Sequence, residues 1–278
     1  MENTMRLDDL RETGNVDDRR GIGGGHIALG GGGLLAVLVI SYFLGVDPSQ
    51  FLNNVDTGAP TQQQNTGAPR ADDAAYAFSR KIVGSAEDVW TPILRAKGVS
   101  FSPATLTVYD NSTPTGCGMG QTSAGPFYCP QDNHIYLDLS FFNELSDRFG
   151  APGQFAQAYV IAHEFGHHIQ TLMGAMNTDR SSGAAGGSVR IELQADCYAG
   201  VWANHANAQF NILQNGDVEG GLKAANAVGD DTLEKQSQGV VVPDSFTHGT
   251  SAQRMRWFKR GLDSGDMDQC DTLSAREL

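Results

Sequence analysis

The chain has 278 residues, of which 40% are hydrophobic, so it is long and apolar enough to bury one sizeable core. Its formal net charge of −13 argues against a nucleic acid partner, because phosphate binding requires an excess of lysine and arginine. Four cysteines occur without a C-x-x-C pair, so neither a zinc ribbon nor a thioredoxin-type motif is indicated.

An apolar run near the amino terminus predicts a membrane anchor. Residues 27–46 carry no charged side chain, and about 20 apolar residues in a helix suffice to cross the hydrocarbon core of a bilayer. A cleaved signal peptide is the alternative interpretation. We favour an uncleaved anchor, because no small-x-small cleavage site precedes Asp47 and the leader is long.

Basic residues predict how this anchor is oriented. Four arginines precede the apolar run: Arg6, Arg11, Arg19 and Arg20. The next basic residue is Arg70. Basic segments stay on the cytoplasmic side, so we expect residues 1–26 in the cytoplasm and a single crossing of the inner (cytoplasmic) membrane by residues 27–46. The remainder of the chain would then face the periplasm or the cell exterior.

A flexible linker and one folded domain are predicted beyond the anchor. Residues 47–70 are rich in Pro, Gly, Gln, Asn and Thr, which is typical of a linker. The domain comprises residues 71–278. It begins with a helix that Asp72 can cap and that extends to about Val83, followed by a second helix around residues 89–94.

Two segments of this domain alternate in the manner of strands, residues 106–109 and 134–139. Either strand could provide the edge that pairs with an extended peptide, and the sequence does not decide between them. The second segment lies shortly before the helix that carries the most specific motif of the chain.

The four cysteines agree with an exported domain. Of the three possible connectivities, Cys117–Cys129 would close a local loop and leave Cys197–Cys270 to tie the carboxy-terminal tail to a helix. Each disulfide would stabilise the fold by about 2–4 kcal/mol. Four free, buried thiols are the alternative.

The most specific motif is His-Glu-Phe-Gly-His at residues 163–167. Apolar residues at steps of three and four predict a buried helix around it, starting near Pro152 and ending at Gly174. Positions i and i+4 of a helix share one face, so His163 and His167 can bind one zinc ion. A helix whose polar residues pair with one another is the alternative.

Glu164 in this motif is the predicted general base. Three protein ligands would leave one zinc position for water, whose pKa the metal lowers toward about 7. Glu164 would take a proton from that water and pass it to the leaving amine of a peptide. His168 lies about 100° further around the helix and is interpreted as structural.

The third ligand has to come from another segment. The longer metzincin signature would require glycine at position 170 and histidine at position 173, whereas this chain has Gln170 and Met173. After a glycine-rich loop, Ser188 can cap a second helix on which Glu192 and Asp196 are four residues apart.

Glu192 and Asp196 complete the predicted centre. Glu192 would complete a His-His-Glu set around one Zn²⁺ ion, and Asp196 would accept the outer N–H of a ligand histidine. This E-x-x-x-D pair after H-E-x-x-H resembles the gluzincin pattern of thermolysin-like peptidases. A solvated acidic face on an amphipathic helix is the alternative.

A later segment supplies candidates for stabilising the oxyanion. His248 precedes a helix that Thr250 or Ser251 can cap, and Arg254 lies on the first turns of that helix. Membrane-bound gluzincins carry a similar T-H-(P/G)-x-x-x-x-R segment, which implies catalytic roles for His248 and Arg254. An ordinary capped surface helix is the alternative.

Six strings of residues carry a resemblance to a known family: C-G at 117–118, G-P-F-Y-C-P at 125–130, Y-L-D-L-S-F-F at 136–142, H-E-F-G-H-H-I-Q at 163–170, E-L-Q-A-D-C-Y-A-G at 192–200 and T-H-G at 247–249. They resemble the bacterial "putative neutral zinc metallopeptidases", the YpfJ-like proteins, over essentially the whole chain. The resemblance implies an α+β, zincin-like fold of gluzincin type, with a small β-sheet and an active-site helix preceded by one transmembrane helix.

The sequence therefore predicts a membrane-tethered zinc metalloendopeptidase that hydrolyses exported proteins or peptides. The alternative is a catalytically silent zincin-fold protein that serves as a binding or adaptor protein at the cell envelope. Such a protein would most simply have lost Glu164, which is present here.

Overall fold

The structure is a computed structural model that describes residues 5–21, 70, 72–177 and 179–278. The expected membrane span at residues 27–46 lies outside the described residues, as does the linker up to residue 69. Among the described residues, no helix combines the length and the apolar character needed to cross a bilayer. The described residues 5–21 and 72–278 belong to one compact unit.

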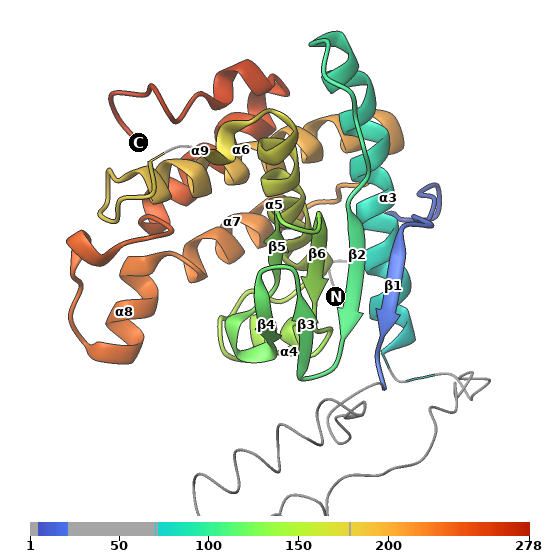
Figure 1. Cartoon of the computed structure of the whole chain (residues 1–278), viewed down its shortest axis with the longest axis horizontal. Coiled ribbons are helices and arrows are strands. Elements are labelled where there is room, and N and C mark those ends of the chain that lie inside the picture. Colours follow the sequence, from blue (N-terminus) through green and yellow to red (C-terminus); the bar gives the residue numbers. More distant parts are fainter. Residues whose placement is uncertain (1–4, 22–69, 71, 178) are drawn as a thin grey trace, which may run out of the picture. The chain divides into compact units, whose positions relative to one another are not determined.

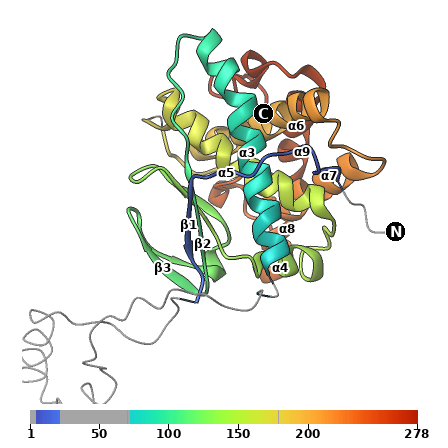
Figure 2. The same cartoon turned by 90° about the vertical axis from the view of Figure 1, so that its right-hand side faces the viewer.

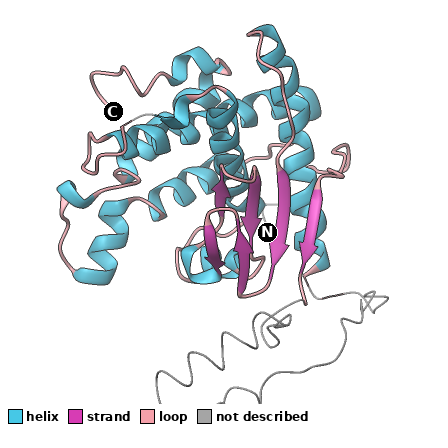
Figure 3. Cartoon of the chain, in the orientation of Figure 1, coloured by secondary structure: helices cyan, strands magenta, loops and turns pink. Residues whose placement is uncertain are grey.

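This unit has an α+β fold with two small sheets (Figure 3). The larger sheet has the order β1-β2-β6-β5, and its strands are β1 (Val16–Arg19), β2 (Thr105–Tyr109), β5 (Phe127–Cys129) and β6 (His134–Leu137). β1 and β6 both run parallel to β2, whereas β5 runs antiparallel to β6. A hairpin of β3 (Ser112–Thr115) and β4 (Gly118–Gln121) forms the second sheet. The two strands expected from the sequence are β2 and β6.

Helices make up most of this unit (Figures 1 and 3). They are α3 (Asp73–Ala96), α4 (Phe141–Asp147), α5 (Gln154–Leu172), α6 (Gly187–Phe210), α7 (Asp217–Ala227), α8 (Asp230–Gln238) and α9 (Ser251–Ser264). Short 3₁₀ turns lie at Thr122–Ala124, Ala175–Asn177, Pro243–Ser245 and Met267–Cys270. The helix expected between Pro152 and Gly174 is α5.

Two sequence expectations about helix ends were wrong. The two helices expected before residue 95 form one continuous helix, α3, because Gly84 and Ser85 are buried small residues within it and do not break it. Ser188 does not cap α6, which begins one residue earlier, and its hydroxyl donates instead to the carbonyl of Arg180. At α9 the cap is Thr250, which forms a reciprocal capping box with Gln253.

The core surrounds α5 and α6 with large side chains, which fixes both helices in place. Trp90 packs edge-on against Tyr198 of α6, and Phe155 of α5 stacks on Trp202 of α6. α5 is buried on nearly every side from Phe155 to Gln170. Such close packing leaves little freedom for the polar residues that α5 carries.

The amino-terminal residues are part of this unit, which differs from the expectation of a separate segment at residues 1–26. Figure 2 shows the chain before β1 crossing α3 and then entering that strand. Met5 and Leu10 are each only 5% exposed, and both belong to the main hydrophobic core. The backbone N–H of Thr13 donates to the carbonyl of Arg80 on α3. The sequence patterns missed this segment because its apolar residues are few and irregularly spaced.

We predict that Leu10→Ala lowers the free energy of unfolding of the full chain by about 2–5 kcal/mol, because it leaves a cavity in the core. Denaturant titration followed by fluorescence measures this change. The matched control is Asp9→Ala, since Asp9 is exposed, and it should change stability by less than about 0.5 kcal/mol. Equal effects of the two substitutions would contradict the packing of this segment.

Candidate metal centre and substrate cleft

The predicted metal ligands come from two helices that touch at a glycine. His163 and His167 lie on α5, and Glu192 lies on α6. A Cβ atom on Gly166 would come within 2.9 Å of the carbonyl oxygen of Ala195 on α6. Glycine at this position of the motif therefore allows the close approach of α5 and α6 that brings the three side chains together.

His163, His167 and Glu192 form one compact cluster. One ligand atom from each residue lies within 4.8 Å of the other two. Glu192 Oε2 is 3.1 Å from His163 Nε2 and 3.5 Å from His167 Nε2. Among the described residues, this is the one group of three or more His, Cys, Asp or Glu side chains with such spacing.

The outer nitrogen of each imidazole has its own partner. His163 Nδ1 lies 2.8 Å from Asp196 Oδ1, as the sequence predicted for an outer N–H. His167 Nδ1 lies 2.7 Å from Gln170 Oε1, and the amide of Gln170 donates to the carbonyl of Ile191. Each Nδ1–H therefore donates to an oxygen, which turns both Nε2 atoms toward Glu192 and keeps them for a metal ion.

Asp196 on α6 is fully buried and is held in place by α9. The guanidinium of Arg254 on α9 donates to both of its carboxylate oxygens, at 2.9 Å each. The hydroxyl of Tyr159 donates to the same carboxylate and accepts from Arg254. Arg254 is itself 4% exposed. Its guanidinium is therefore directed at the support of His163 and at the carbonyl of Val228.

The electrostatics of the cluster favour a cation. Burial opposes charge on His163, but Asp196 and Glu192 outweigh it and raise the pKa of His163 to about 10. Burial also opposes ionisation of Glu192, yet His167 and His163 hold the pKa of this carboxyl well below its usual range. Two imidazoles and one carboxylate are a donor set typical of catalytic zinc, so these residues fit that metal.

A cleft of about 870 Å³ opens over the cluster and includes Glu164. Its walls come from α4, α5, α6, α8, β5 and the loop that carries His248. Glu164 is 8% exposed, and burial raises the pKa of its carboxyl, while His163 and His167 oppose that rise. A carboxyl with a raised pKa next to a metal site suits proton transfer near neutral pH.

The strand that borders this cleft is neither of the two considered from the sequence. β2 is paired on both sides, by β1 and β6, and β6 lies between β2 and β5. β5 is the edge strand on the side away from β1, it contacts α5 (Figure 1), and its Phe127 and Tyr128 line the cleft. Sequence reasoning missed β5 because three residues are too few to show alternation.

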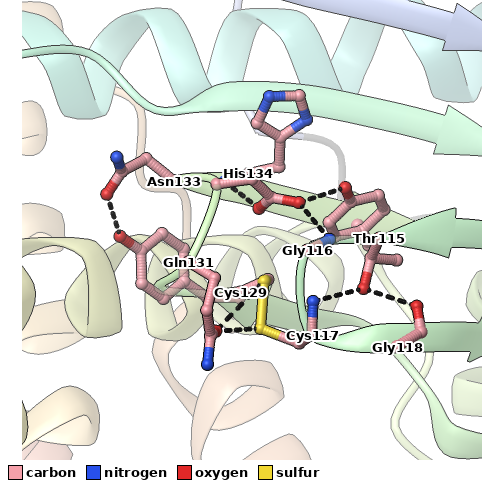
Figure 4. Close-up of a disulfide and its surroundings, with 11 residues drawn as sticks. Thr115, Gly116, Cys117, Gly118, Cys129, Gln131, Asn133 and His134 are labelled. Carbon is pink, nitrogen blue, oxygen red and sulfur yellow. Dashed lines mark hydrogen bonds between the residues drawn. A yellow bond between two sulfur atoms is a disulfide. The ribbon is translucent and has the colours of Figure 1, made fainter.

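A disulfide fastens one end of β5. Cys117 and Cys129 are joined, as expected, and this bond ties β5 to the hairpin of β3 and β4 (Figure 4). Figure 4 also shows the hydroxyl of Thr115, which accepts from the backbone N–H of Cys117 and donates to the carbonyl of Gly118. The second expected pair, Cys197 and Cys270, is joined as well.

His168 links β5 to α5, the helix that carries two of the predicted metal ligands. Its Nδ1 is 3.1 Å from the hydroxyl of Tyr128, and its Nε2 is 2.7 Å from the carbonyl of Ser102. The side chain is completely buried, and burial lowers the pKa of its imidazole. This arrangement agrees with the structural role predicted for His168.

His248 lines the cleft from the loop before α9, and its side chain is 51% exposed. Its Nδ1 lies 3.2 Å from Asp230 Oδ1. The other oxygen of Asp230 accepts the backbone N–H groups of Thr247, His248 and Gly249. Asp230 therefore fixes both the loop and the Nδ1 side of the His248 ring.

Sequence reasoning missed three residues that support the site. Tyr159 and Gln170 share α5 with the ligands, and their positions four residues before His163 and three after His167 offered a usable signal. Asp230 offered none, because its link to His248 is made by folding and not by helical spacing.

Comparison with known proteins adds independent information. A family described as "Putative neutral zinc metallopeptidase" matches residues 5–273. The chain is 46% identical over 289 residues to "Uncharacterized protein YpfJ" of Escherichia coli strain K12. The aligned region covers 97% of this chain and 99% of that protein. It is 40% identical over 258 residues to "Uncharacterized protein Rv2575" of Mycobacterium tuberculosis strain H37Rv, with 84% and 85% covered. No solved structure matches the chain.

We predict that Gln170→Ala lowers zinc affinity by about 10- to 100-fold, because His167 loses the acceptor that orients its ring. Competition with a chromophoric chelator measures the affinity. Gln157→Ala, several turns earlier on the same helix, is the control and should leave the affinity unchanged. Equal zinc affinities of the Gln170 variant and the unchanged protein would contradict this assignment.

Proposed function

Because the chain belongs to the family described as "Putative neutral zinc metallopeptidase", we propose that it is a zinc-dependent peptidase that hydrolyses peptide bonds in proteins or peptides. The observation that carries this proposal is the His163, His167 and Glu192 cluster, which shares one cleft with Glu164. A site that only binds a metal ion would not need the buried carboxyl of Glu164, which lies beside the cluster and is not one of the predicted ligands.

His163, His167 and Glu192 would hold one Zn²⁺ ion. When bound, zinc supplies a Lewis acid that lowers the pKa of water and polarises the scissile carbonyl. Glu164 accepts the proton of the attacking water and returns it to the leaving amine, and its raised pKa brings it closer to neutrality for both transfers.

His248 and Arg254 take different roles in this proposal. His248 reaches the cleft and its Nδ1 is held by Asp230, so its protonated ring can donate from Nε2 to the developing oxyanion. Arg254 is directed at Asp196, which orients His163. We therefore assign Arg254 the role of a positioning residue in place of the oxyanion role expected from the sequence.

The free edge of β5 supports recognition of an extended peptide. A substrate added to this edge would run along the cleft next to α5, with main-chain hydrogen bonds that do not depend on its side chains. The apolar run at residues 27–46 supports attachment of the enzyme to a membrane of the cell envelope. Exported proteins or peptides are then the substrates within reach.

The general base is tested with Glu164→Gln in the full chain. We expect this variant to keep one zinc ion per chain. Its kcat/KM on an unfolded reporter protein should fall by about 10²- to 10⁴-fold. Zinc content is measured by elemental analysis and cleavage by release of fluorescent peptides. Glu144→Gln is the control, because Glu144 lines the same cleft from α4.

Two outcomes would count against the peptidase. Cleavage that survives Glu164→Gln would remove Glu164 as the base. Zinc binding without cleavage of any reporter, in the unchanged protein, would favour the binding or adaptor protein considered from the sequence.

The role of His248 predicts a pH effect. Asp230 raises the pKa of His248, burial lowers it, Glu192 raises it and Arg254 lowers it, with a net rise. The protonated ring is the donor, so activity should fall as pH rises through this pKa. Asp230→Asn removes the carboxylate charge, lowers the pKa of His248 and should move the basic limb of the kcat/KM profile to lower pH. Exposed Asp244→Asn is the control, and an unmoved limb in the Asp230 variant would rule out this role.

A further inference from the structure

The amino-terminal segment carries a second conclusion that does not depend on peptidase activity. We infer that residues 5–21 lie on the same side of the membrane as residues 72–278, so that a single crossing does not separate them. The two parts flank the apolar run in the sequence but fold into one compact unit. A bilayer with a hydrocarbon core about 30 Å thick cannot pass between residues that are in contact.

The contacts of the segment with α3 are specific. Glu87 on α3 is 5% exposed and accepts hydrogen bonds from three residues of the segment. These donors are Arg11 at 2.8 Å, Thr13 at 2.8 Å and Asn15 at 2.9 Å. Thr13 is completely buried. The segment therefore satisfies a carboxylate of the domain that has little access to water.

The segment also completes the larger sheet. β1 pairs in parallel with β2 over four residue pairs, from Val16 with Leu106 to Arg19 with Tyr109. Without β1, the buried strand β2 would expose the N–H and C=O groups of one edge. Parallel pairing requires a crossover connection, and α3 provides it in this unit.

Three of the four arginines that predicted a cytoplasmic amino end, Arg11, Arg19 and Arg20, have side-chain partners in the folded unit. Arg11 pairs with Asp88 as well as Glu87, and Arg19 donates to the hydroxyl of Thr113 and the carbonyl of Pro114. The positive-inside rule counts every basic residue near the ends of a span, whether or not folding pairs it with a carboxylate. Here they serve the fold, so their number carries less information about orientation.

Arg20 brings together the two ends of the chain that flank the apolar run. Its side chain is 4% exposed and pairs with Asp18 at 2.7 Å, with Asp72 at 3.2 Å and with Asp73 at 3.5 Å. It also lies over the ring of Tyr76, 4.1 Å from the centroid. The chain thus leaves the unit and returns to it at one place.

The disulfides indicate which side this is. Bonds such as Cys117–Cys129 and Cys197–Cys270 persist in oxidising compartments outside the cytoplasm. The whole unit, amino-terminal residues included, then lies there. This replaces the expectation that residues 1–26 remain in the cytoplasm.

Sidedness is tested on the full chain in cells with a small epitope tag at each end. A protease that does not cross the inner membrane is added to spheroplasts, and we expect it to remove both tags. A tag at the amino end that stays protected while the carboxy-terminal tag is removed would overturn the inference. Detergent-treated spheroplasts are the control, because both tags must then be digested.

A glycine in α3 provides a second test. The direction in which its replacement changes the melting temperature decides whether residues 5–21 pack against α3. A Cβ on Gly84 would lie 2.5 Å from the carbonyl oxygen of Arg11, so Gly84→Ala should lower the melting temperature of the full chain. If residues 5–21 lay elsewhere, the same change would raise it by roughly 2–4 °C through helix propensity. Gly220→Ala is the matched control, since a Cβ there meets no atom within 4 Å. A melting temperature of Gly84→Ala above that of the unchanged protein would overturn the inference.

Discussion

The site depends on one buried carboxylate, Asp196, at which three helices meet. It belongs to α6, it accepts the outer N–H of His163 from α5, and it receives both arms of Arg254 from α9. Removing one partner from such a buried pair costs about 3–5 kcal/mol, because the other charge is left without compensation. The helices that carry the predicted metal ligands are therefore held in register by the same interaction that sets the tautomer of His163. The stability of the fold and the arrangement of the predicted ligands thus depend on the same contacts.

The parts of the site that could be predicted from sequence are those governed by helical spacing. Residues four apart share a face, so His163 with His167 and Glu192 with Asp196 could be paired before any fold was known. The position of Glu192 opposite the histidines required the assumption that the two helices pack together, which Gly166 permits. Arg254 was found by its place in a motif, but its direction toward Asp196 depends on how α9 crosses α6, and no local pattern encodes that crossing.

The parts that could not be predicted are short strands and long-range pairs. β1 and β5 have four and three residues, and neither shows a pattern that distinguishes it from a loop. β1 also precedes the apolar run at residues 27–46, whereas the rest of the domain follows it. The residues before the apolar run therefore looked like a cytoplasmic leader. Charge counting assumes that basic residues near a span are free. Arg11 and Arg20 show the limit of that assumption, because folding pairs them with carboxylates more than fifty residues away.

The carboxy-terminal tail shows why support of the metal site extends beyond the ligand helices. His167 donates to Gln170, the amide of Gln170 also donates to Gln194, and the amide of Gln194 donates to the carbonyl of Cys270. Cys270 is covalently bound to Cys197, one residue beyond Asp196 on α6. His163 and His167 are thus each oriented by a buried chain of contacts that ends on a different element, α9 for His163 and the tail for His167. Because the two chains meet on α6 about one turn from Glu192, a shift of α6 would displace all three predicted ligands together.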